Sequence, residues 1–261
     1  MKQIFNSLCI FACLIFAIAG KPIRQTTTNA GQAPLIFLTY NVRNCVGLDN
    51  VVDYERVGNA ISKINPDIVA LQELDSSTAR SKHVDVLGKL AGFTGLTPTF
   101  HASIDYDGGK YGIGILSKEK PLSIEGIALP GSEEKRSAVA VEMKNYVFVC
   151  THFSLTETDR LQSVALLNML AAKYTKPVFL AGDLNTNPRS PVIDALSKNW
   201  QILSDTTKMT IPANKPVNCI DYIMVRKQDK YRIKVLDRAV GDEPVASDHL
   251  PVWVQVQIGK K

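Results

Sequence analysis

Asp183 and Asn185 stand two residues apart, directly after the apolar run Val178-Phe179-Leu180-Ala181. Such a run, stopped by a glycine and a polar cluster, predicts a buried strand that opens into a loop. Ligands gather at the carboxyl ends of strands in α/β sheets, so an acid and an amide placed there can meet a substrate. The alternative is an Asx turn that only ends a core strand. Other strand boundaries in the chain decide between the two.

Polar side chains also close three other predicted strands. The strand over residues 35–40 ends at Asn41, the strand over 67–71 runs into Glu73, and the strand over 146–151 runs into His152. Glu73 beside Asn41 suits a hard divalent cation, which takes oxygen ligands. His152 has the chemistry of an acid, a base or a phosphate donor, although a lone histidine also fits a purely structural role.

Two acids and a histidine complete the set. Asp221 lies inside the apolar strand predicted over residues 219–225, where a carboxylate is costly to bury unless it is paired. Asp248 and His249 come just before the last strand. Asp221 is therefore the expected partner of His249.

The elements that must position these residues alternate between helices and strands. Apolar spacing predicts helices over residues 53–65 and 79–91, and a capping box at Ser154–Glu157 precedes a helix over 161–172. Ser190-Pro191 opens a further short helix. We also expect strands over 111–117, 122–129 and 138–143, irregular chain over 200–218, and a basic strand over 231–238 paired with the strand over 219–225. The fold class is α/β.

The first 34 residues differ in composition from the rest of the chain. Lys2, an apolar run over residues 8–18 and Ala17-Ile18-Ala19 predict a signal peptide over residues 1–20, with a membrane signal anchor as the alternative. Residues 21–34 read as a flexible leader, and residues 35–258 are long enough for one large domain. We expect an extracytoplasmic protein, periplasmic or secreted, that is a monomer and has no transmembrane span after cleavage.

Charge and cysteine content add weaker constraints. The net charge of +5 favours anionic partners, but the basic residues are scattered along the chain. Cys45, Cys150 and Cys219 remain after signal cleavage, and an odd number means at least one free thiol or an intermolecular bridge. Their spacing does not suggest zinc, and we expect free buried thiols.

In chain order, the motifs of this sequence resemble the endonuclease/exonuclease/phosphatase superfamily over residues 35–258. They are TYN ending at Asn41, QE at Glu73, YGIGILS from Tyr111, TH at His152, GDLN from Gly182, IDYI around Asp221 and SDH ending at His249. The superfamily includes pancreatic-type deoxyribonucleases, neutral sphingomyelinases and inositol polyphosphate 5-phosphatases. The resemblance implies a four-layer α/β sandwich with two central mixed β-sheets flanked by helices, and one site for Mg²⁺- or Mn²⁺-dependent hydrolysis of phosphoesters.

The resemblance also implies a role for each residue. Glu73 would be the main metal ligand, with Asp248 in the metal shell and Asn41 holding metal or phosphate. Asp183 would orient and deprotonate the attacking water, and Asn185 would position water and phosphate. His249, oriented by Asp221, would contact the phosphate and stabilise its developing charge. Arg136 resembles a phosphate-contacting arginine, and its alternative is a solvated loop charge.

Departures from the family pattern bear on the substrate. His152 matches the nucleases, sphingomyelinases and 5-phosphatases, but the glutamate that supports this histidine in the nucleases is missing, which leaves Asp105 or Asp107 as substitutes. Where the apurinic endonucleases carry an aspartate, this chain has Arg43. We expect a phosphoesterase for a small molecule or a lipid head group. The alternatives are an extracellular nuclease acting on DNA or RNA and a non-catalytic phosphate-binding module.

Overall fold

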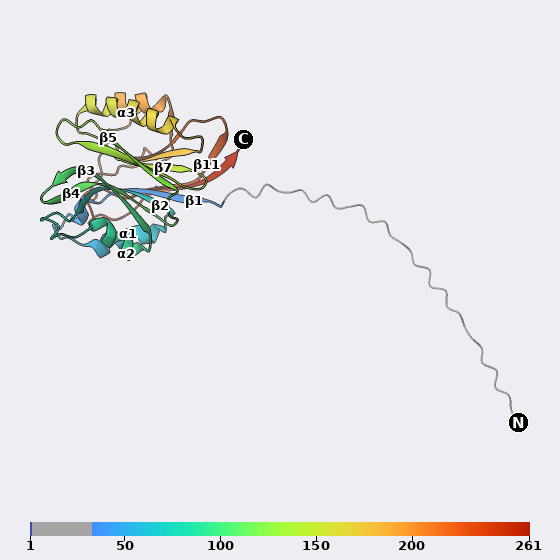
Figure 1. The fold of residues 1–261 in the computed structure, drawn as a ribbon, viewed down its shortest axis with the longest axis horizontal. Coiled ribbons are helices and arrows are strands. Elements are labelled where there is room, and N and C mark those ends of the chain that lie inside the picture. Colours follow the sequence, from blue (N-terminus) through green and yellow to red (C-terminus); the bar gives the residue numbers. More distant parts are fainter. Residues whose placement is uncertain (2–32) are drawn as a thin grey trace. The chain divides into compact units, whose positions relative to one another are not determined.

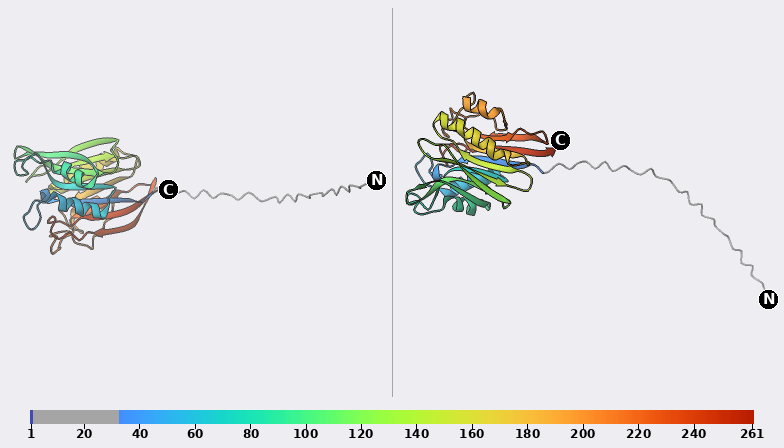
Figure 2. Two further views of the ribbon diagram at one scale, coloured as in Figure 1. Left: turned by 90° about the horizontal axis from the view of Figure 1, so that it is seen from below. Right: turned by 45° about the horizontal axis from the view of Figure 1, so that its top comes forward.

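Two six-stranded β-sheets lie face to face, and helices cover the outer face of each sheet (Figure 1). This computed structural model describes Met1 and residues 33–261. The predicted signal peptide and nearly all of the predicted leader lie outside the described residues. The layers confirm the four-layer sandwich that the resemblance implies, and the two further views in Figure 2 show the same arrangement.

The first sheet contains both the first and the last strand of the fold. Its strands are β1 (Leu35–Asn41), β2 (Ile68–Ser76), β3 (Thr97–Tyr106), β4 (Gly109–Ser117), β11 (Tyr231–Val240) and β12 (Val252–Lys260). They follow the spatial order β11-β12-β1-β2-β4-β3, with β1 and β2 parallel.

The second sheet is built from the middle of the chain. Its strands are β5 (Ser123–Leu129), β6 (Arg136–Glu142), β7 (Val147–His152), β8 (Val178–Asp183), β9 (Trp200–Ile202) and β10 (Asp221–Arg226). Their spatial order is β5-β6-β7-β8-β10-β9, and β7 and β8 are parallel.

Two pairs of helices cover the sheets. They are α1 (Tyr54–Ile64) and α2 (Val86–Thr94) on the first sheet and α3 (Glu157–Ala172) and α4 (Pro191–Ser197) on the second; a short turn, η1 (Arg43–Cys45), follows β1. Among the residues described, no helix is both long and apolar enough to cross a membrane.

Aromatic side chains fill the space between the sheets. The ring centroid of Phe37 on β1 lies 4.5 Å from that of Phe179 on β8 and 5.4 Å from that of Phe148 on β7. Strands β1, β7 and β8 are buried along nearly their whole length because both of their faces are covered. This explains why they read as unbroken apolar runs rather than alternating patterns.

Helix α4 begins as predicted, but α2 and α3 begin differently. Ser190 caps α4 by accepting a hydrogen bond from the Ile193 N–H. The helix predicted over 79–91 starts only at Val86, because the preceding loop is held by hydrogen bonds to Asp75. The predicted capping box is wrong: Thr156 is the N-cap of α3, and the Ser154 hydroxyl donates to Glu133 and Asp159 instead.

Two further expectations about strands are wrong. Strand β11, which covers the predicted basic strand, pairs with β12 in the first sheet and not with β10 in the second. Its alternating exposure, typical of an edge strand, fits either sheet. The chain predicted to be irregular after residue 200 opens with β9, which pairs with β10.

Candidate active site

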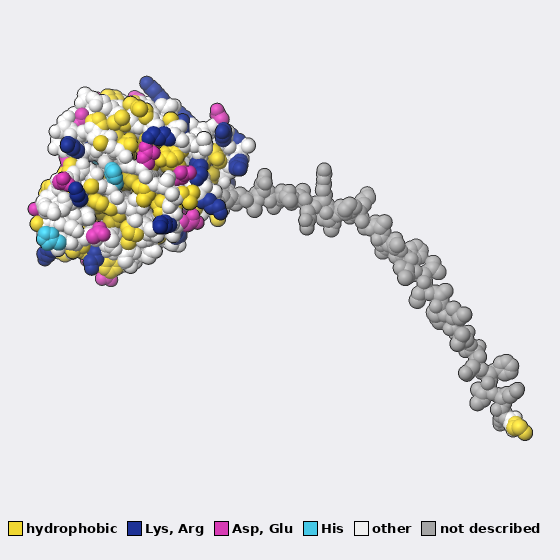
Figure 3. Space-filling view, viewed as in Figure 1, with side chains coloured by type: hydrophobic (Ala, Val, Ile, Leu, Met, Phe, Trp, Pro, Cys, Tyr) yellow, Lys and Arg dark blue, Asp and Glu magenta, His cyan; other side chains and the backbone are white. Residues whose placement is uncertain are grey.

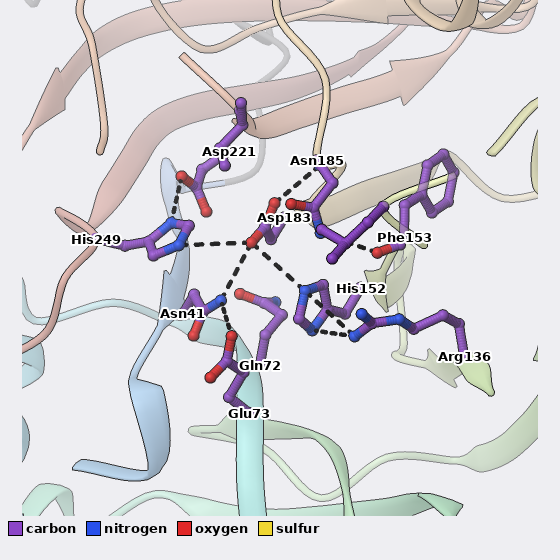
Figure 4. A network of polar contacts seen from close by, with 12 residues as sticks. Asn41, Gln72, Glu73, Arg136, His152, Phe153, Asp183, Asn185, Asp221 and His249 are labelled. Carbon is purple, nitrogen blue, oxygen red and sulfur yellow. Dashed lines mark hydrogen bonds and ion pairs between the residues drawn. The ribbon is translucent and has the colours of Figure 1, made fainter. Parts of the chain in front are cut away.

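Strand pairing places three of the predicted catalytic residues side by side where three interior strands of the second sheet meet the loops. His152, at the end of β7, stands opposite Asp183 at the end of the parallel strand β8. Asp221, at the start of the antiparallel strand β10, stands opposite Asp183 on its other side. The three residues therefore form a row with Asp183 in the middle (Figure 4).

Asn41 and Glu73 approach this row from the first sheet. Nδ2 of Asn41 donates to Oε1 of Glu73 at 2.9 Å and to Oδ2 of Asp183 at 3.1 Å. Its Oδ1 accepts a hydrogen bond from the Arg43 N–H, so the nitrogen faces the carboxylates. An amide N–H in this direction suits contact with phosphate oxygens better than coordination of a metal.

Glu73 occupies an irregular position on β2. Its φ of 60° falls in the left-handed region, and the pairing of β2 with β4 shifts register between Leu71 and Leu74. A residue other than glycine held there costs on the order of 1–3 kcal/mol, and such strain is concentrated at functional sites. The bulge sets the Glu73 carboxylate beside Asn41.

His249 is held in its cationic form. Its Nδ1 lies 2.9 Å from Oδ2 of Asp221, as the sequence analysis expected, and its Nε2 lies 3.6 Å from Oδ2 of Asp183. Burial favours the neutral ring, but the Asp221 and Asp183 carboxylates outweigh it and raise the pKa of His249 to about 10. At neutral pH this side chain therefore presents a positive charge beside Asp183.

His152 has the opposite protonation state. Its Nε2 lies 3.5 Å from Oδ2 of Asp183, and Nη1 of Arg136 lies 3.2 Å from its Nδ1. Burial, supported by the charge of Arg136, lowers the pKa of His152 to about 4 despite the nearby carboxylate. The ring is therefore neutral in the pH range where His249 is charged.

Arg136 is the first residue of β6 and is buried, so the alternative of a solvated loop charge is wrong. Its guanidinium lies 3.3 Å from a Glu133 oxygen and 3.1 Å from a Glu134 oxygen. The Nε atom is buried and has no hydrogen-bond partner among the described residues. Arg136 therefore contacts His152 through Nη1, and its Nε is enclosed by the protein.

Neither Asp105 nor Asp107 supports His152. Asp105 is exposed and pairs with Lys110, and Asp107 accepts a hydrogen bond from the Arg80 N–H at 2.7 Å. Both belong to the outer tip of the β3–β4 hairpin, where Asp105 pairs within the hairpin and Asp107 binds the loop that contains Arg80. The expectation that one of them substitutes for the missing glutamate is wrong.

Asn185 and Asp248 occupy the margins of the site. The Asn185 backbone N–H donates to Oδ1 of Asp183 at 2.9 Å, and its side-chain nitrogen donates to the Phe153 carbonyl at 2.9 Å. Oδ2 of Asp248 lies 3.8 Å from Nε of Arg43, and its Oδ1 accepts from the Ser247 hydroxyl.

One group of side chains among the described residues brings its donor atoms close enough together to suit a cation. Among the described residues, Asp183, Asp221 and His249 bring one potential ligand atom each to within 4.8 Å of one another. Burial raises the pKa of Glu73; Asn41 opposes the rise, whereas the Asp248 and Asp183 carboxylates add to it. A hard cation beside Glu73 would relieve this repulsion, and the carboxylate oxygens of Glu73 and Asp248 are donors that fit such a cation.

Sequence reasoning missed residues that hold the site in place. Glu133 accepts hydrogen bonds from the Leu155 N–H and the Ser154 hydroxyl while it pairs with Arg136. The Thr210 hydroxyl donates to Oδ2 of Asp221 at 2.6 Å. The run Glu133-Glu134-Lys135-Arg136 contained a signal for the first of these, since two acids directly precede an arginine at the start of a strand.

Comparison with known proteins decides the family. The model of the Endonuclease/Exonuclease/phosphatase family matches residues 38–249. The chain belongs to this family. No curated protein matches it.

Several solved structures share the fold, and one of them is an endonuclease/exonuclease/phosphatase from Bacteroides vulgatus. The protein from Bacteroides vulgatus is 17% identical with a TM-score of 0.72, and the match covers 87% of this chain and 100% of that one. A mannosyl-6-phosphatase from Bacteroides thetaiotaomicron is 19% identical with a TM-score of 0.63, covering 85% and 99%. ANGEL2, a 2′,3′-cyclic phosphatase, is 12% identical with a TM-score of 0.64, covering 86% and 95%. With its family membership and its buried Asp/His cluster, the chain is a phosphoesterase of this fold.

Proposed function

We propose that the protein is an extracytoplasmic phosphoesterase that uses Mg²⁺ or Mn²⁺ to hydrolyse a small or lipid-linked phosphoester. The observation that carries the proposal is the convergence on one oxygen, Oδ2 of Asp183. Asn41 Nδ2 lies 3.1 Å from it, His152 Nε2 3.5 Å and His249 Nε2 3.6 Å. A buried carboxylate oxygen surrounded by donors from both sheets is well placed to orient a water and accept its proton.

In this mechanism the oxygen of a water attacks phosphorus and the bond between phosphorus and the leaving oxygen breaks. Asp183 accepts the proton of the water, and the leaving oxygen takes a proton from solvent. The positive charges of His249, which lies 3.6 Å from Asp183, and of Arg136, which contacts His152, would stabilise the charge that builds on the phosphoryl oxygens. Donors fixed in place before the reaction stabilise that charge most effectively.

Glu73 and Asp248 would hold the cation, with Asn41 beside them. The bound cation supplies Lewis-acid activation of the phosphoryl group. We assign it to this set rather than to Asp183, Asp221 and His249, because Oδ2 of Asp221 is already engaged by Nδ1 of His249 and by the Thr210 hydroxyl. Asp221 then orients His249 by accepting a hydrogen bond from its Nδ1.

Surface charge favours a substrate with one phosphoester over a nucleic acid. On the face shown in Figure 3, basic and acidic side chains are interspersed rather than gathered by sign. The net charge is only +5. Nucleic-acid binding depends on many phosphate contacts and a basic stripe that follows the backbone.

The proposed location rests on the signal-like character of residues 1–20. Expression with and without these residues, followed by fractionation of the cells, tests it. Cleavage and export of the full chain are expected, and retention of the uncleaved chain in the cytoplasm would contradict the proposal.

An activity screen tests the chemistry. The enzyme is incubated with p-nitrophenyl phosphate, bis(p-nitrophenyl) phosphate, sphingomyelin and plasmid DNA, each with Mg²⁺, with Mn²⁺ and with EDTA. We expect metal-dependent release of phosphate or alcohol from at least one small ester or from sphingomyelin, and loss of that activity in Asp183→Asn. Cleavage of DNA alone would replace the proposal with the nuclease alternative.

A further inference from the structure

The end of the sandwich opposite the candidate active site carries a concentration of positive charge. Residues 226–234 and 260–261 contain seven basic residues and one acid, so these two segments carry more net positive charge than the whole chain. Six of the seven basic residues are exposed. We call the seven residues the basic end; they are Arg226, Lys227, Lys230, Arg232, Lys234, Lys260 and Lys261.

Strand β10 connects the basic end to the candidate active site. It begins at Asp221, which contacts His249, and ends at Arg226. At roughly 3.4 Å per residue, the strand separates these two ends by about 17 Å. The basic end therefore takes no part in the chemistry proposed above, and its charges do not line the path of a substrate to Asp183.

The fold brings the two basic segments together and leaves their charges unbalanced. Lys260 stands opposite Tyr231 in the β11–β12 pairing, and the Lys261 N–H donates to the Lys230 carbonyl at 3.1 Å. Among the described residues, none of the seven basic side chains forms an ion pair. Such a cluster of uncompensated cations attracts an anionic partner.

A cleft of about 370 Å³ opens within the basic end. Nη1 of Arg226 donates to the Ala171 carbonyl at 2.6 Å, and Nζ of Lys227 donates to the Ser197 carbonyl at 2.6 Å, so two of the cations at the cleft are held in place. The basic residues and the single acid of its lining are Arg226, Lys227, Arg232, Lys261 and Asp229. The cleft therefore suits a group of negative charge, such as a phosphate.

Positive charge on β11 also has a simpler function. β11 is an edge strand, and charged side chains on an edge prevent pairing with a strand of another chain. This function accounts for Lys234, which lies within the strand. It does not account for Arg226, at the end of the interior strand β10, or for Lys227 and Lys261, which follow the ends of β10 and β12 and line the cleft.

The first strand of the domain begins at the same end. Leu35 of β1 pairs with Val256 of β12, which pairs with Val235 of β11, and Figure 1 shows the C-terminus on the side where β1 begins. The 34 residues before β1 are therefore attached at the basic end. They include the apolar run over residues 8–18, followed by Lys21 and Arg24 with no acid before residue 35. Basic residues next to an apolar segment are typical of contact with anionic lipids.

We propose that the basic end binds a membrane surface that contains anionic phospholipids, with a lipid phosphate in the cleft and the surrounding lysines on neighbouring head groups. The inference does not depend on the proposed reaction, because it concerns the opposite end of the domain. A nucleic acid matches this end less well, since single strands need aromatic side chains on which bases stack, and Tyr231, which is half-buried, is the only aromatic residue that lines the cleft. A domain bound in this way leaves Asp183 open to substrates from solution.

Sedimentation with lipid vesicles tests the proposal. The chain is used from residue 21 onward, because residues 31–261 form one compact unit that contains the three hydrophobic clusters. It is mixed with vesicles of phosphatidylcholine and with vesicles of phosphatidylcholine and phosphatidylglycerol. We expect binding to the mixed vesicles alone, and we expect this binding to weaken as NaCl is added, because salt screens the attraction.

The key variant combines three substitutions of exposed residues, Lys230→Gln, Arg232→Gln and Lys234→Gln. Each basic residue near an anionic surface strengthens binding about fivefold, so the affinity for mixed vesicles should fall at least about tenfold. The matched control removes the same charge at exposed positions outside the basic end, through Lys89→Gln, Lys208→Gln and Lys215→Gln. It should bind the mixed vesicles as the wild type does.

The other outcomes overturn the proposal. They are an absence of binding to mixed vesicles, equal binding to both kinds of vesicle, unchanged binding in the key variant, and an equal loss in the control. Binding of duplex DNA without binding of mixed vesicles would assign the basic end to a nucleic acid instead. A key variant that self-associates in gel filtration but keeps its vesicle binding would leave protection of the β11 edge as the function of these charges. The phosphoesterase reaction is tested separately and stands or falls independently of these results.

Discussion

The side-chain nitrogen of Asn41 lies 3.1 Å from Oδ2 of Asp183 and joins strand β1 of one sheet to strand β8 of the other. The same nitrogen reaches Glu73 on β2. One amide therefore sets the spacing between the residue assigned to the metal and the residue assigned to the water. The groups that must cooperate come from two sheets, and Asn41 is a direct link between them.

Removing the metal should abolish activity. We expect EDTA to inactivate the enzyme and Mg²⁺ or Mn²⁺ to restore it, because the donors around Glu73 are oxygens. Glu73→Gln should raise the metal concentration for half-maximal activity by about tenfold or more. Titration of activity against Mg²⁺ measures this, with the exposed Glu119→Gln as control. Full activity after exhaustive chelation would refute the metal assignment.

The Asp183–His249 pair should control turnover. Asp183→Asn and His249→Ala should each lower kcat on the order of a hundredfold or more, since one removes the proton acceptor and the other a fixed positive charge. Circular dichroism should show an unchanged fold. His83→Asn, at an exposed position with φ of 61°, is the control and should keep normal turnover. Normal turnover in either site variant would show that the reacting groups are elsewhere.

Activity should depend only weakly on salt. A substrate gripped at a single phosphoester engages one or two charges, so turnover should change within about threefold between low and physiological ionic strength. A nuclease that neutralises several phosphates would lose affinity steeply, with a log–log slope near the number of contacts. Initial rates at a series of NaCl concentrations separate these cases, and a steep slope on duplex DNA would support the nuclease alternative.

Glu133 should make stability depend on acidity. Burial opposes its ionisation, but hydrogen bonds from Leu155 and Ser154 outweigh this and lower the pKa of Glu133 from 4.5 to about 2. The unfolded chain therefore binds this proton more tightly than the folded one, so the stabilisation is complete above about pH 4.5 and is lost as the pH falls toward 2.

Thermal melts of the wild type and Glu133→Gln measure this effect. The difference in Tm should be largest near neutral pH and should shrink below about pH 4.5, where the protonated wild-type side chain resembles the amide. Glu119→Gln controls for the loss of one negative charge. A Tm difference that stays constant from neutral to acid pH would contradict the assignment.

The sequence singles out residues that the structure brings together, because each one breaks a local rule. Asn41, His152 and Asp183 are polar residues at the ends of apolar strands, and Asp221 is an acid inside one. Each needs a partner, so the pairing of Asp221 with His249 follows from the cost of burying a carboxylate. Polar residues in such positions can be recognised from the sequence without knowledge of the fold.

What the sequence does not predict depends on contacts between distant segments. Strand β11 has an edge-strand pattern that fits either sheet, and its choice of β12 is a matter of tertiary packing. The start of α2 moves to Val86 because Asp75 binds Arg80 in the preceding loop. The partners of His152 were missed for the same reason, since Arg136 is brought to it by strand pairing.

Asn41, His152, Asp183 and Asp221 lie at the ends of the interior strands β1, β7, β8 and β10, and Glu73 lies within the interior strand β2. In native-state hydrogen exchange, amides in such strands open only when the whole molecule unfolds, whereas irregular loops open locally. The loops over residues 42–53 and 77–85 can therefore open locally or change in sequence while the strands that carry the site residues remain folded. Substitutions in these loops can therefore change the range of substrates without lowering the global stability of the fold. That stability keeps Asn41 in contact with Asp183.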